Sequence, residues 1–506
     1  MTEYRCIYLL LMLAGLTASH ARAATAEQTN GKRYNVLFIA IDDLNDWVGC
    51  LGGNPQAITP NFDRYARDHA MVMNRAYCPS TVCCPTRSAL LTGKHATNTG
   101  VYGNGQNLKH APKAKDLETL PEYFGNRGYH TLTRGKIYHK HGNPNATGGV
   151  DEGQWAFHEF VKAKGSNGAT LWEEKPALEG VKTGGTPFTW GAVEGPTEKT
   201  KDYATCAWAA EQLERDFDGK PFFMAVGVSK PHLAWYVPQE FFDLYSLDEI
   251  EAAPFKGDDL DDIVRKDGKH IFKPTGRFLV ADGNDMHKQA NRAYLACVSY
   301  VDHCLGVLFD ALEKSKYADN TIVMIWGDHG WHLSEKMHYG KTGLWEESAR
   351  VPFIVNVPGV TPPNTKCDGV VNLLDMYPTL LELCGLPPNP ENDGRSFARL
   401  LANPSMEWNH PTLTTYQFKN HSITDGRYRY TWYGGRADGA EELYDHDADP
   451  LEHTNLASNP EYKEVIARLR KHLPTHHEPN SPSNPHNALK KSKDQKRAER
   501  KQGKSE

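Results

Sequence analysis

The 506-residue sequence lacks any uninterrupted run of about 20 apolar residues, the length that a transmembrane helix needs, so we expect no transmembrane anchor. It also lacks an excess of basic residues: 57 lysines and arginines stand against 63 aspartates and glutamates, for a formal net charge of -6. This balance gives no electrostatic reason to expect a nucleic-acid partner. With 39% hydrophobic and 24% charged residues, the chain has the composition of an ordinary globular protein with a sizeable core.

The N-terminus does contain a shorter apolar run, "CIYLLLMLAGLTA", which follows Arg5 and precedes small residues around Ala23. A basic residue, a short apolar core and a small-residue site are typical of a cleaved secretory signal. We therefore expect a signal peptide over residues 1–23 and an exported protein, periplasmic or secreted. An uncleaved anchor is the alternative interpretation.

Loss of that segment leaves nine of the ten cysteines, an odd number that requires at least one free or modified thiol. Cys297 and Cys304 lie in a stretch with helical apolar spacing, which predicts buried, inert thiols. Cys367 and Cys384 are candidates for a disulfide, although sequence does not fix the pairing.

The main body alternates strands and helices, which predicts an α/β fold with a large, mostly parallel sheet sandwiched by helices over residues 33–390. The predicted strands are continuous apolar runs rich in β-branched and aromatic residues. They are "YNVLFIAIDD", "GYHTLTRGKIYH", "KPFFMAVGVSKPH", "TIVMIWGDHG" and "VPFIVNVPG".

The pattern changes after "CGLPPNPENDGRSF", where shorter, turn-linked strands precede one helix. We expect a smaller C-terminal subdomain over residues 391–473, made of an antiparallel sheet and a helix. Residues 474–506 are rich in Pro, Ser, Asn and Lys, which predicts a disordered basic tail.

Polar groups follow four of the predicted strands. In open parallel sheets the carboxyl ends of strands line one crevice, so these groups are expected to converge there. They are Asp42 and Asp43, Lys136 and His139, Lys230 and His232, and Asp328 and His329. Three carboxylates gathered at one edge would titrate upward unless a cation lay among them, which favours a hard divalent ion.

The stretch "STVCCPTRSALLTG" supplies a nucleophile and an anion site. Pro85 favours a helix start there, so the paired cysteines lie at a positive helix end. Cys83 stands in the spacing C-x-P-x-R with Arg87, and Cys84 occupies the x position.

With this motif the sequence resembles the type I sulfatases of the alkaline phosphatase superfamily, whose signature is C-x-P-x-R followed by Leu, Thr and Gly. The likeness extends from about Tyr34 to Gly385 and on through "ELYDHDADPLEHTNLA". The blocks "GKIYH", "FMAVGVSKPHLAW", "ANRAYLACVSYVD" and "GDHGWHLSE" are similar to the iduronate-2-sulfatase-like branch. The resemblance implies an alkaline phosphatase-like fold and hydrolysis of sulfate esters.

The resemblance also implies the cofactors and the site. Cys83 would be oxidised to formylglycine by a dedicated maturation enzyme, and its hydrate would attack sulfur. A calcium ion would be held by Asp42, Asp43, Asp328, His329 and the modified Cys83. Arg87, Lys136 and Lys341 would neutralise the sulfate oxygens, His139 would act as a base, and His232 would protonate the leaving alcohol.

The expected substrate is an O-sulfate on a saccharide of a sulfated polysaccharide or glycosaminoglycan-like glycan. Trp235, Trp331, Trp345 and Tyr102 are candidates to stack on sugar rings, or else to pack in the core. His95 and Asn98 are candidates for further sugar contacts. The alternatives are a phosphonate or phosphate diester hydrolase of the same superfamily, and a glycan-binding protein without catalysis.

Overall fold

The computed structural model describes residues 33–139, 154–163, 170–171, 188–265, 267–435 and 439–482. The predicted signal peptide over residues 1–23 and the tail from residue 483 lie outside the described residues.

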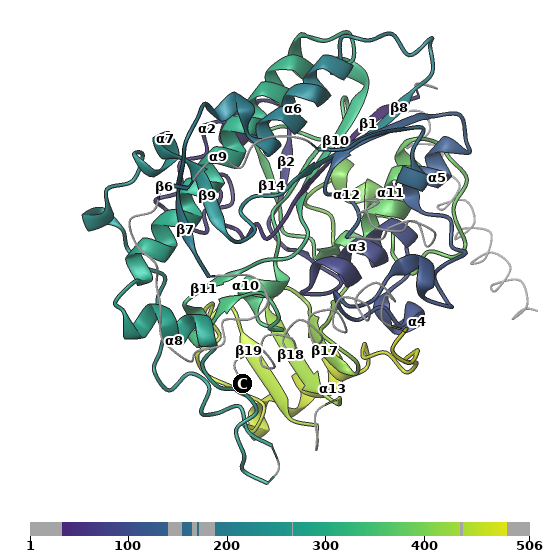
Figure 1. Ribbon diagram of the computed structural model, residues 1–506. Helices are drawn as coiled ribbons and strands as arrows, with labels where there is room; N and C mark the ends of the chain where they lie inside the picture. Colours follow the sequence, from purple (N-terminus) through teal and green to yellow (C-terminus); the bar gives the residue numbers. More distant parts are fainter. Residues whose placement is uncertain are drawn as a thin grey trace, which may run out of the picture.

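An eight-stranded sheet forms the centre of the molecule (Figure 1). In spatial order its strands are β14 (Thr365–Cys367), β2 (Met71–Met73), β13 (Phe353–Asn356), β10 (Thr321–Gly327), β1 (Asn35–Ile41), β8 (Phe222–Val228), β4 (His130–Gly135) and β5 (Glu159–Val161). Every neighbouring pair is parallel except the two that β13 makes, with β10 and β2. The predicted mostly parallel sheet is confirmed, and the antiparallel direction of β13 is the feature that its apolar sequence did not indicate.

Strand β1 shows why the sheet needs helices on both faces. All seven of its residues are buried, and alternate side chains enter different cores. Leu37 and Ile39 pack with helices α2 (Pro60–Asp68), α6 (Lys201–Gln212) and α9 (His287–Lys314). Phe38 packs with the opposite layer, formed by α3 (Cys83–Thr92), α5 (Leu120–Gly125), α11 (Met376–Leu383) and α12 (Ala398–Ala402).

Helix α9 is long and apolar enough to cross a membrane by length and composition, a feature that the search for uninterrupted apolar runs missed. It packs against α2, α6 and β9 (Trp235–Pro238), and 78% of its most apolar window is buried inside the protein. Cys297 and Cys304 lie on it and are fully buried, as predicted. Its apolar character is that of a core helix.

The C-terminal subdomain is an antiparallel sheet of β16 (Thr412–Thr415), β17 (Asn420–Thr424), β18 (Tyr428–Tyr433) and β19 (Glu441–Asp445), covered by α13 (Lys463–Arg470). This confirms the predicted architecture (Figure 1). The sheet of this subdomain begins at Thr412, later than residue 391. Phe397, just before α12, and Leu400, within it, are instead buried in the core of the main body.

Residues 474–482 differ from the prediction of a disordered tail. The backbone N–H of Glu478 donates to the carbonyl of Thr97 (2.7 Å), and that of Ser481 donates to Gly100 (2.8 Å). The side chain of Gln106 also donates to the carbonyl of Ser481 (2.8 Å). We call residues 477–481 the C-terminal strap, since they lie across the segment that follows α3.

The remaining strands and α-helices are short. They are β3 (Ala76–Tyr77), α4 (Ala96–Thr99), β6 (Thr170–Leu171), β7 (Trp190–Val193), α7 (Gln239–Phe242), α8 (Gly276–Gly283), β11 (His332–Leu333), β12 (Tyr339–Gly340), α10 (Glu346–Ala349) and β15 (Val371–Asn372). Within the described part of the chain all nine cysteines are free thiols, so Cys367 and Cys384 do not form the disulfide for which they were candidates.

Candidate active site

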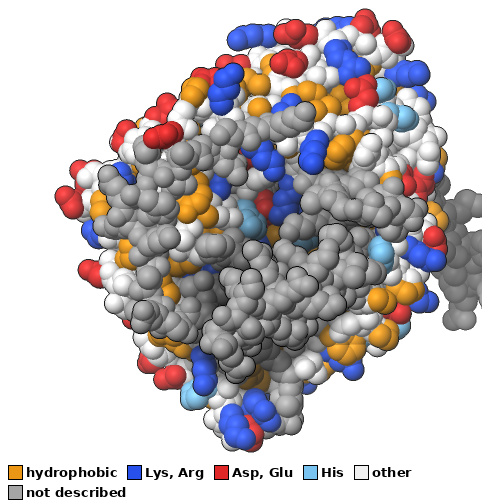
Figure 2. Space-filling model, in the orientation of Figure 1, with side chains coloured by type: hydrophobic (Ala, Val, Ile, Leu, Met, Phe, Trp, Pro, Cys, Tyr) orange, Lys and Arg blue, Asp and Glu red, His pale blue; other side chains and the backbone are white. Residues whose placement is uncertain are grey.

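The polar groups that follow β1 and β10 meet the start of α3 at one edge of the sheet. Asp42 and Asp43 come directly after β1, Asp328 and His329 come directly after β10, and Cys83 is the first residue of α3. Single ligand atoms of Asp42, Cys83, Asp328 and His329 lie within 4.8 Å of one another, and so do those of Asp42, Asp43, Cys83 and His232. The predicted convergence is confirmed for Asp42, Asp43, Lys136, His232, Asp328 and His329. Figure 2 shows a hollow near the middle of this face in which basic, acidic and histidine side chains gather.

Cys83 is fully buried, and polar groups surround its side chain. Its Sγ lies 2.8 Å from Lys341 Nζ, 3.2 Å from His329 Nε2 and 4.0 Å from Asp43 Oδ1. Burial raises the pKa of the thiol, and the charge of Asp42 adds to that rise. A buried thiol that stays protonated is a poor nucleophile, so residue 83 as an ordinary cysteine is unsuited to attack.

The two carboxylates after β1 stay ionised, because cations of the protein itself lie among them. Burial alone would raise the pKa of Asp42, but Lys136, His232 and Arg87 outweigh it and hold this pKa well below its usual value. Burial likewise opposes ionisation of Asp43, and His232 and Lys341 lower its pKa. The cations of the protein itself therefore balance much of the negative charge.

Lysines contact both carboxylates directly. Lys136 Nζ donates to Asp42 Oδ2, and Lys341 Nζ donates to Asp43 Oδ1 at 2.6 Å. Asp43 has a positive φ of 64°, a backbone conformation uncommon for residues other than glycine and often found at functional sites. Lys341 is therefore a member of the cluster and not a solvated loop charge.

Arg87 is fully buried beneath the cluster. Its Nε donates to Asp328 Oδ2 at 2.8 Å, and its Nη2 lies 3.5 Å from Asp42 Oδ1. Its Nη1 donates to the carbonyls of Lys136 and Ile137, which ties α3 to the end of β4. Arg87 thus holds two carboxylates and one loop in place.

Two histidines differ in their exposure and partners. His329 is fully buried, its Nδ1 lies 3.0 Å from the carbonyl of Gly330, and burial lowers its pKa, so it is neutral. His232 has 29% of its side chain exposed; its Nδ1 lies 2.6 Å from the carbonyl of Leu233, and its Nε2 lies 4.0 Å from Asp42 and 3.9 Å from Asp43.

His139 is half-buried and follows Lys136 by three residues. Lys230 instead donates to the carbonyls of His232 and Ala234 and supports the loop.

The donor set fits a hard cation. Oδ1 of Asp42 and Oδ2 of Asp43 are buried and accept no hydrogen bond from any described residue. Buried carboxylate oxygens that lack donors are the ligands that calcium prefers, with the His329 nitrogen as the least typical member of the set. The cluster is therefore a metal-site candidate.

The aromatic candidates for sugar stacking are core residues. Trp235, Trp331, Trp345 and Tyr102 are at most 3% exposed. The indole of Trp345 donates to Glu442 (2.7 Å) and the hydroxyl of Tyr102 to the carbonyl of Glu478 (3.0 Å). Packing, the second interpretation of these residues, is the one that the structure supports.

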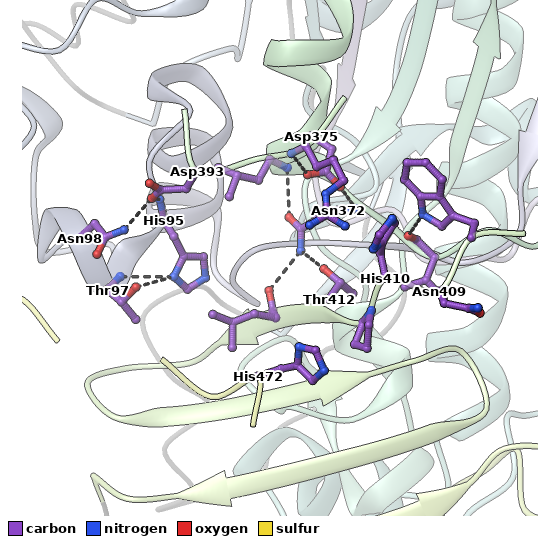
Figure 3. Close-up of a pocket in the computed structure, with 16 residues that line it drawn as sticks. His95, Thr97, Asn98, Asn372, Asp375, Asp393, Asn409, His410, Thr412 and His472 are labelled. Atoms are coloured by element: carbon purple, nitrogen blue, oxygen red, sulfur yellow. Dashed lines mark hydrogen bonds between the residues drawn. The ribbon is translucent and has the colours of Figure 1, made fainter. Parts of the chain in front are cut away.

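His95 and Asn98 lie at the other end of α3 from Cys83, about 15 Å away for a helix of this length. They line a cavity of about 360 Å³ between the main body and the C-terminal sheet, and its described lining includes none of the cluster residues (Figure 3). His95 is buried and accepts a hydrogen bond from the backbone of Thr97, which caps α4. Its role is structural.

Two further groups have no distinguishing pattern in the sequence. Arg277, in the first turn of α8, lies over the Trp331 ring with its Cζ 5.6 Å from the ring centroid. Glu346, His446 and Glu452 form a second set with metal-ligand spacing. Arg429 already lies between these two glutamates, with its Nε 2.9 Å from Glu452 and its Nη2 paired with Glu346, so this set is an ion-pair network.

Comparison with known proteins gives the family. The sulfatase family matches residues 34–386, and the C-terminal region of N-sulphoglucosamine sulphohydrolase matches residues 327–478. A sulfatase of Formosa agariphila is 35% identical over 87% of this chain and 86% of its own length. Iduronate 2-sulfatase of Homo sapiens is 27% identical over 88% of this chain and 96% of its own length.

The fold is also shared with the phosphonate monoester hydrolase of Agrobacterium radiobacter, at a TM-score of 0.68 and 20% identity over 87% of this chain and 94% of that one. Fold alone therefore does not separate the two chemistries. The sulfatase family match spans the central sheet, α3 and every residue of the cluster around Cys83. The chain belongs to the sulfatase family and is a sulfuric ester hydrolase.

Proposed function

We propose that this sulfatase removes O-sulfate from a saccharide unit of a sulfated polysaccharide or glycosaminoglycan-like glycan, with residue 83 converted from cysteine to formylglycine. One observation carries the proposal. The Cys83 side chain, in its C-x-P-x-R motif, lies among Lys341, His329 and Asp43 at the end of the central sheet.

The residues around position 83 fit both groups that the family requires. Asp42, Asp43, Asp328 and His329 would hold Ca²⁺, which supplies positive charge beside the nucleophile. Formylglycine at residue 83 would supply the nucleophilic hydroxyl of a hydrated aldehyde. The Lys341 ammonium and His329 Nε2 are nitrogen groups placed to contact oxygens at the position that Sγ takes now.

Lys136 and Lys341 are placed to bind the sulfate oxygens. Each has a carboxylate partner on one side and is partly exposed, with 19% and 13% of the side chain accessible. As negative charge moves onto the sulfate, these fixed ammonium groups stabilise it without rearrangement. Arg87 acts one layer below, where it orients Asp42 and Asp328.

His232 is the candidate to protonate the leaving alcohol. The carbonyl of Leu233 accepts a hydrogen bond from its Nδ1, and its Nε2 faces the carboxylates of the cluster. The His232 side chain is also more exposed than that of His329, the other histidine around Cys83. A proton on Nε2 can pass to a departing oxygen within hydrogen-bond reach. His139, four residues after the end of β4, is the candidate base that would take the proton of the second hydroxyl.

The saccharide assignment draws on the relatives, since human iduronate 2-sulfatase is named for a sulfated uronic acid. Export through the predicted signal peptide, to the periplasm or the medium, accords with a polymeric substrate. A maturation enzyme that reads the Cys83 motif is the expected protein partner.

The test is co-expression with a formylglycine-generating enzyme, followed by mass spectrometry of the peptide that carries Cys83 and assay of aryl sulfate turnover. Wild type should show the aldehyde at residue 83 and turnover, and Cys83→Ala should show neither. Cys84→Ala is the matched control, because the Cys84 Sγ contacts the carbonyl of Gln106, away from the cluster. Turnover that survives in Cys83→Ala would refute the proposed nucleophile.

The rival activities are separated by substrate. The matured enzyme should hydrolyse an aryl sulfate faster than an aryl phosphodiester or phosphonate monoester, and the reverse order would favour the alternative. A matured protein that binds sulfated oligosaccharides but hydrolyses none would be a glycan-binding protein. Addition of a chelator should lower activity, and calcium binding measured by calorimetry should be lost in Asp42→Asn.

A further inference from the structure

The segment that carries Lys341 is fixed to helix α8. The backbone N–H of Thr275, the residue before α8, donates to the carbonyl of Met337 at 3.1 Å. The Thr275 hydroxyl in turn accepts from the backbone N–H of Tyr339 at 3.2 Å. Strand β12, Tyr339–Gly340, leads directly into Lys341. The first turn of α8 therefore has a defined position relative to the active-site lysine.

Arg277 in that first turn lies beside the site. Its Cζ is 5.6 Å from the centroid of the Trp331 ring, and Lys341 Nζ is 5.8 Å from the same centroid. The two cations are thus no farther apart than the sum of these distances, and Lys341 itself reaches Cys83 Sγ at 2.8 Å. A Cβ on Gly340 would lie 3.3 Å from Arg277 Nη1, so glycine there leaves room for the guanidinium.

The positive charge of Arg277 interacts with Asp43 of the same site. Burial lowers the pKa of its guanidinium, and the charge of Asp43 opposes that change, so the group stays positive at neutral pH. Lys136, Lys341 and Arg87 contact the carboxylates of the cluster. Arg277 shares the Trp331 ring with Lys341 of that set and is half-buried.

We propose that Arg277 binds a second negative charge on the sugar that carries the scissile sulfate. A planar guanidinium pairs with a carboxylate or a sulfate through two parallel hydrogen bonds, a geometry that a lysine does not reproduce. Arg277 is therefore a specificity residue that selects anionic sugars over neutral ones. This inference rests on the proposed saccharide sulfatase function and extends it to the charge of the sugar.

The test compares three sulfated glycosides on the matured, calcium-loaded enzyme. The first carries a carboxylate at C6, the second carries a second sulfate, and the third has a neutral hydroxymethyl group. Arg277→Gln should lower kcat/KM by 10-fold to 100-fold, through KM, on whichever charged sugar is the substrate, and by less than twofold on the neutral one. Arg277→Lys should recover part of the loss.

Lys273→Gln is the matched control, because Lys273 is an exposed cation on the same segment and its loss should change kcat/KM less than twofold. Equal losses of Arg277→Gln on charged and neutral sugars, or a fall in kcat alone, would show a structural role and overturn the inference. No effect on any sugar would overturn it as well. A wild-type enzyme that hydrolyses none of the three would refute the proposed function itself, a result distinct from the failure of Arg277 to discriminate.

Discussion

Lys341 makes two of the closest contacts in the active site, yet nothing in its local sequence requires chemistry. Its ammonium lies 2.6 Å from Asp43 and 2.8 Å from Cys83, because β12 turns the chain back beneath β11. Burial by itself would lower the pKa of Lys341, but Asp43 and the neighbouring anions raise it instead, so the side chain remains an ammonium. A fixed positive charge at this position is suited to binding sulfate oxygens.

Lys341→Met should lower kcat of the matured enzyme by about 10²-fold to 10³-fold, the loss typical when one preorganised charge donor is removed. Lys94→Met, at the opposite end of α3, should leave kcat within twofold, since its partners Glu391 and Asp393 lie outside the cluster. Steady-state kinetics on an aryl sulfate measures both. Full activity in Lys341→Met would remove this residue from the catalytic set.

At the scale of elements, α10 and the C-terminal sheet are joined by a buried ion-pair network. Arg429 on β18 is fully buried and pairs with Glu346 on α10 and with Glu452. His446 adds a contact of 2.9 Å to Glu452. Since the loop before α10 carries Lys341, this network anchors the subdomain to the segment that leads into the active site.

Arg429→Met should destabilise the protein by about 3–5 kcal/mol, because it leaves two carboxylates buried without their cation. Arg427→Met is the control: Arg427 is 52% exposed where it pairs with Asp445, and loss of such a solvent-screened pair should change the free energy of unfolding far less. Urea unfolding at pH 7 measures both. A cost below that of the control would show that the network contributes nothing to subdomain docking.

The same network predicts a pH dependence. Burial alone would raise the pKa of Glu346, but Arg429, His446 and Arg350 lower it to about 2. A depressed carboxyl pKa gives stability that is present above the unfolded-state value, near 4.3, and is lost as the pH falls toward the folded value. In Arg429→Met the pKa of Glu346 should rise, so the stability gap to wild type should narrow as the pH falls from about 4.3 toward about 2. A gap that stays constant with pH would contradict this assignment.

At the scale of the whole molecule, the C-terminal strap is hydrogen-bonded to the segment that follows the active-site helix α3. Removal of residues 474–506 should lower Tm by at least about 2 °C, since it breaks the backbone bonds of Glu478 and Ser481 to Thr97 and Gly100. Removal of residues 483–506 alone should leave Tm within about 1 °C, since it keeps the hydrogen bonds of Glu478 and Ser481. Equal Tm values for the two truncations, measured by thermal unfolding, would show that the strap has no structural role.

Much of the fold was predictable because long buried strands appear in the sequence as continuous apolar runs. β1, β8 and β10 are seven-residue apolar runs, and the polar groups after them meet because parallel strands end at one edge. Strands β2 and β14 have three residues each, too few for a periodic signal. The antiparallel direction of β13 depends on tertiary contacts that no local pattern encodes.

The residues of the site also fall into those that the sequence predicts and those that it does not. Cys83, Asp42 and Asp328 were predictable because each belongs to a motif or a strand end. Arg277 was not, since one arginine at a helix start has no distinguishing pattern and acquires its position only when α8 packs on β12. The buried tryptophans were candidates for sugar stacking, and the structure places them in the core. Their position near a motif in the sequence does not reveal which rings face solvent.

The complete burial of residues 83–92 sets an order of events in the synthesis of this protein. An enzyme that must grip the extended peptide around Cys83 finds no accessible chain once α3 has packed between the sheet and α11. Under the proposed function, conversion of the thiol would have to be complete before this layer of the core assembles. A molecule that folds first would keep its cysteine for as long as it stays folded.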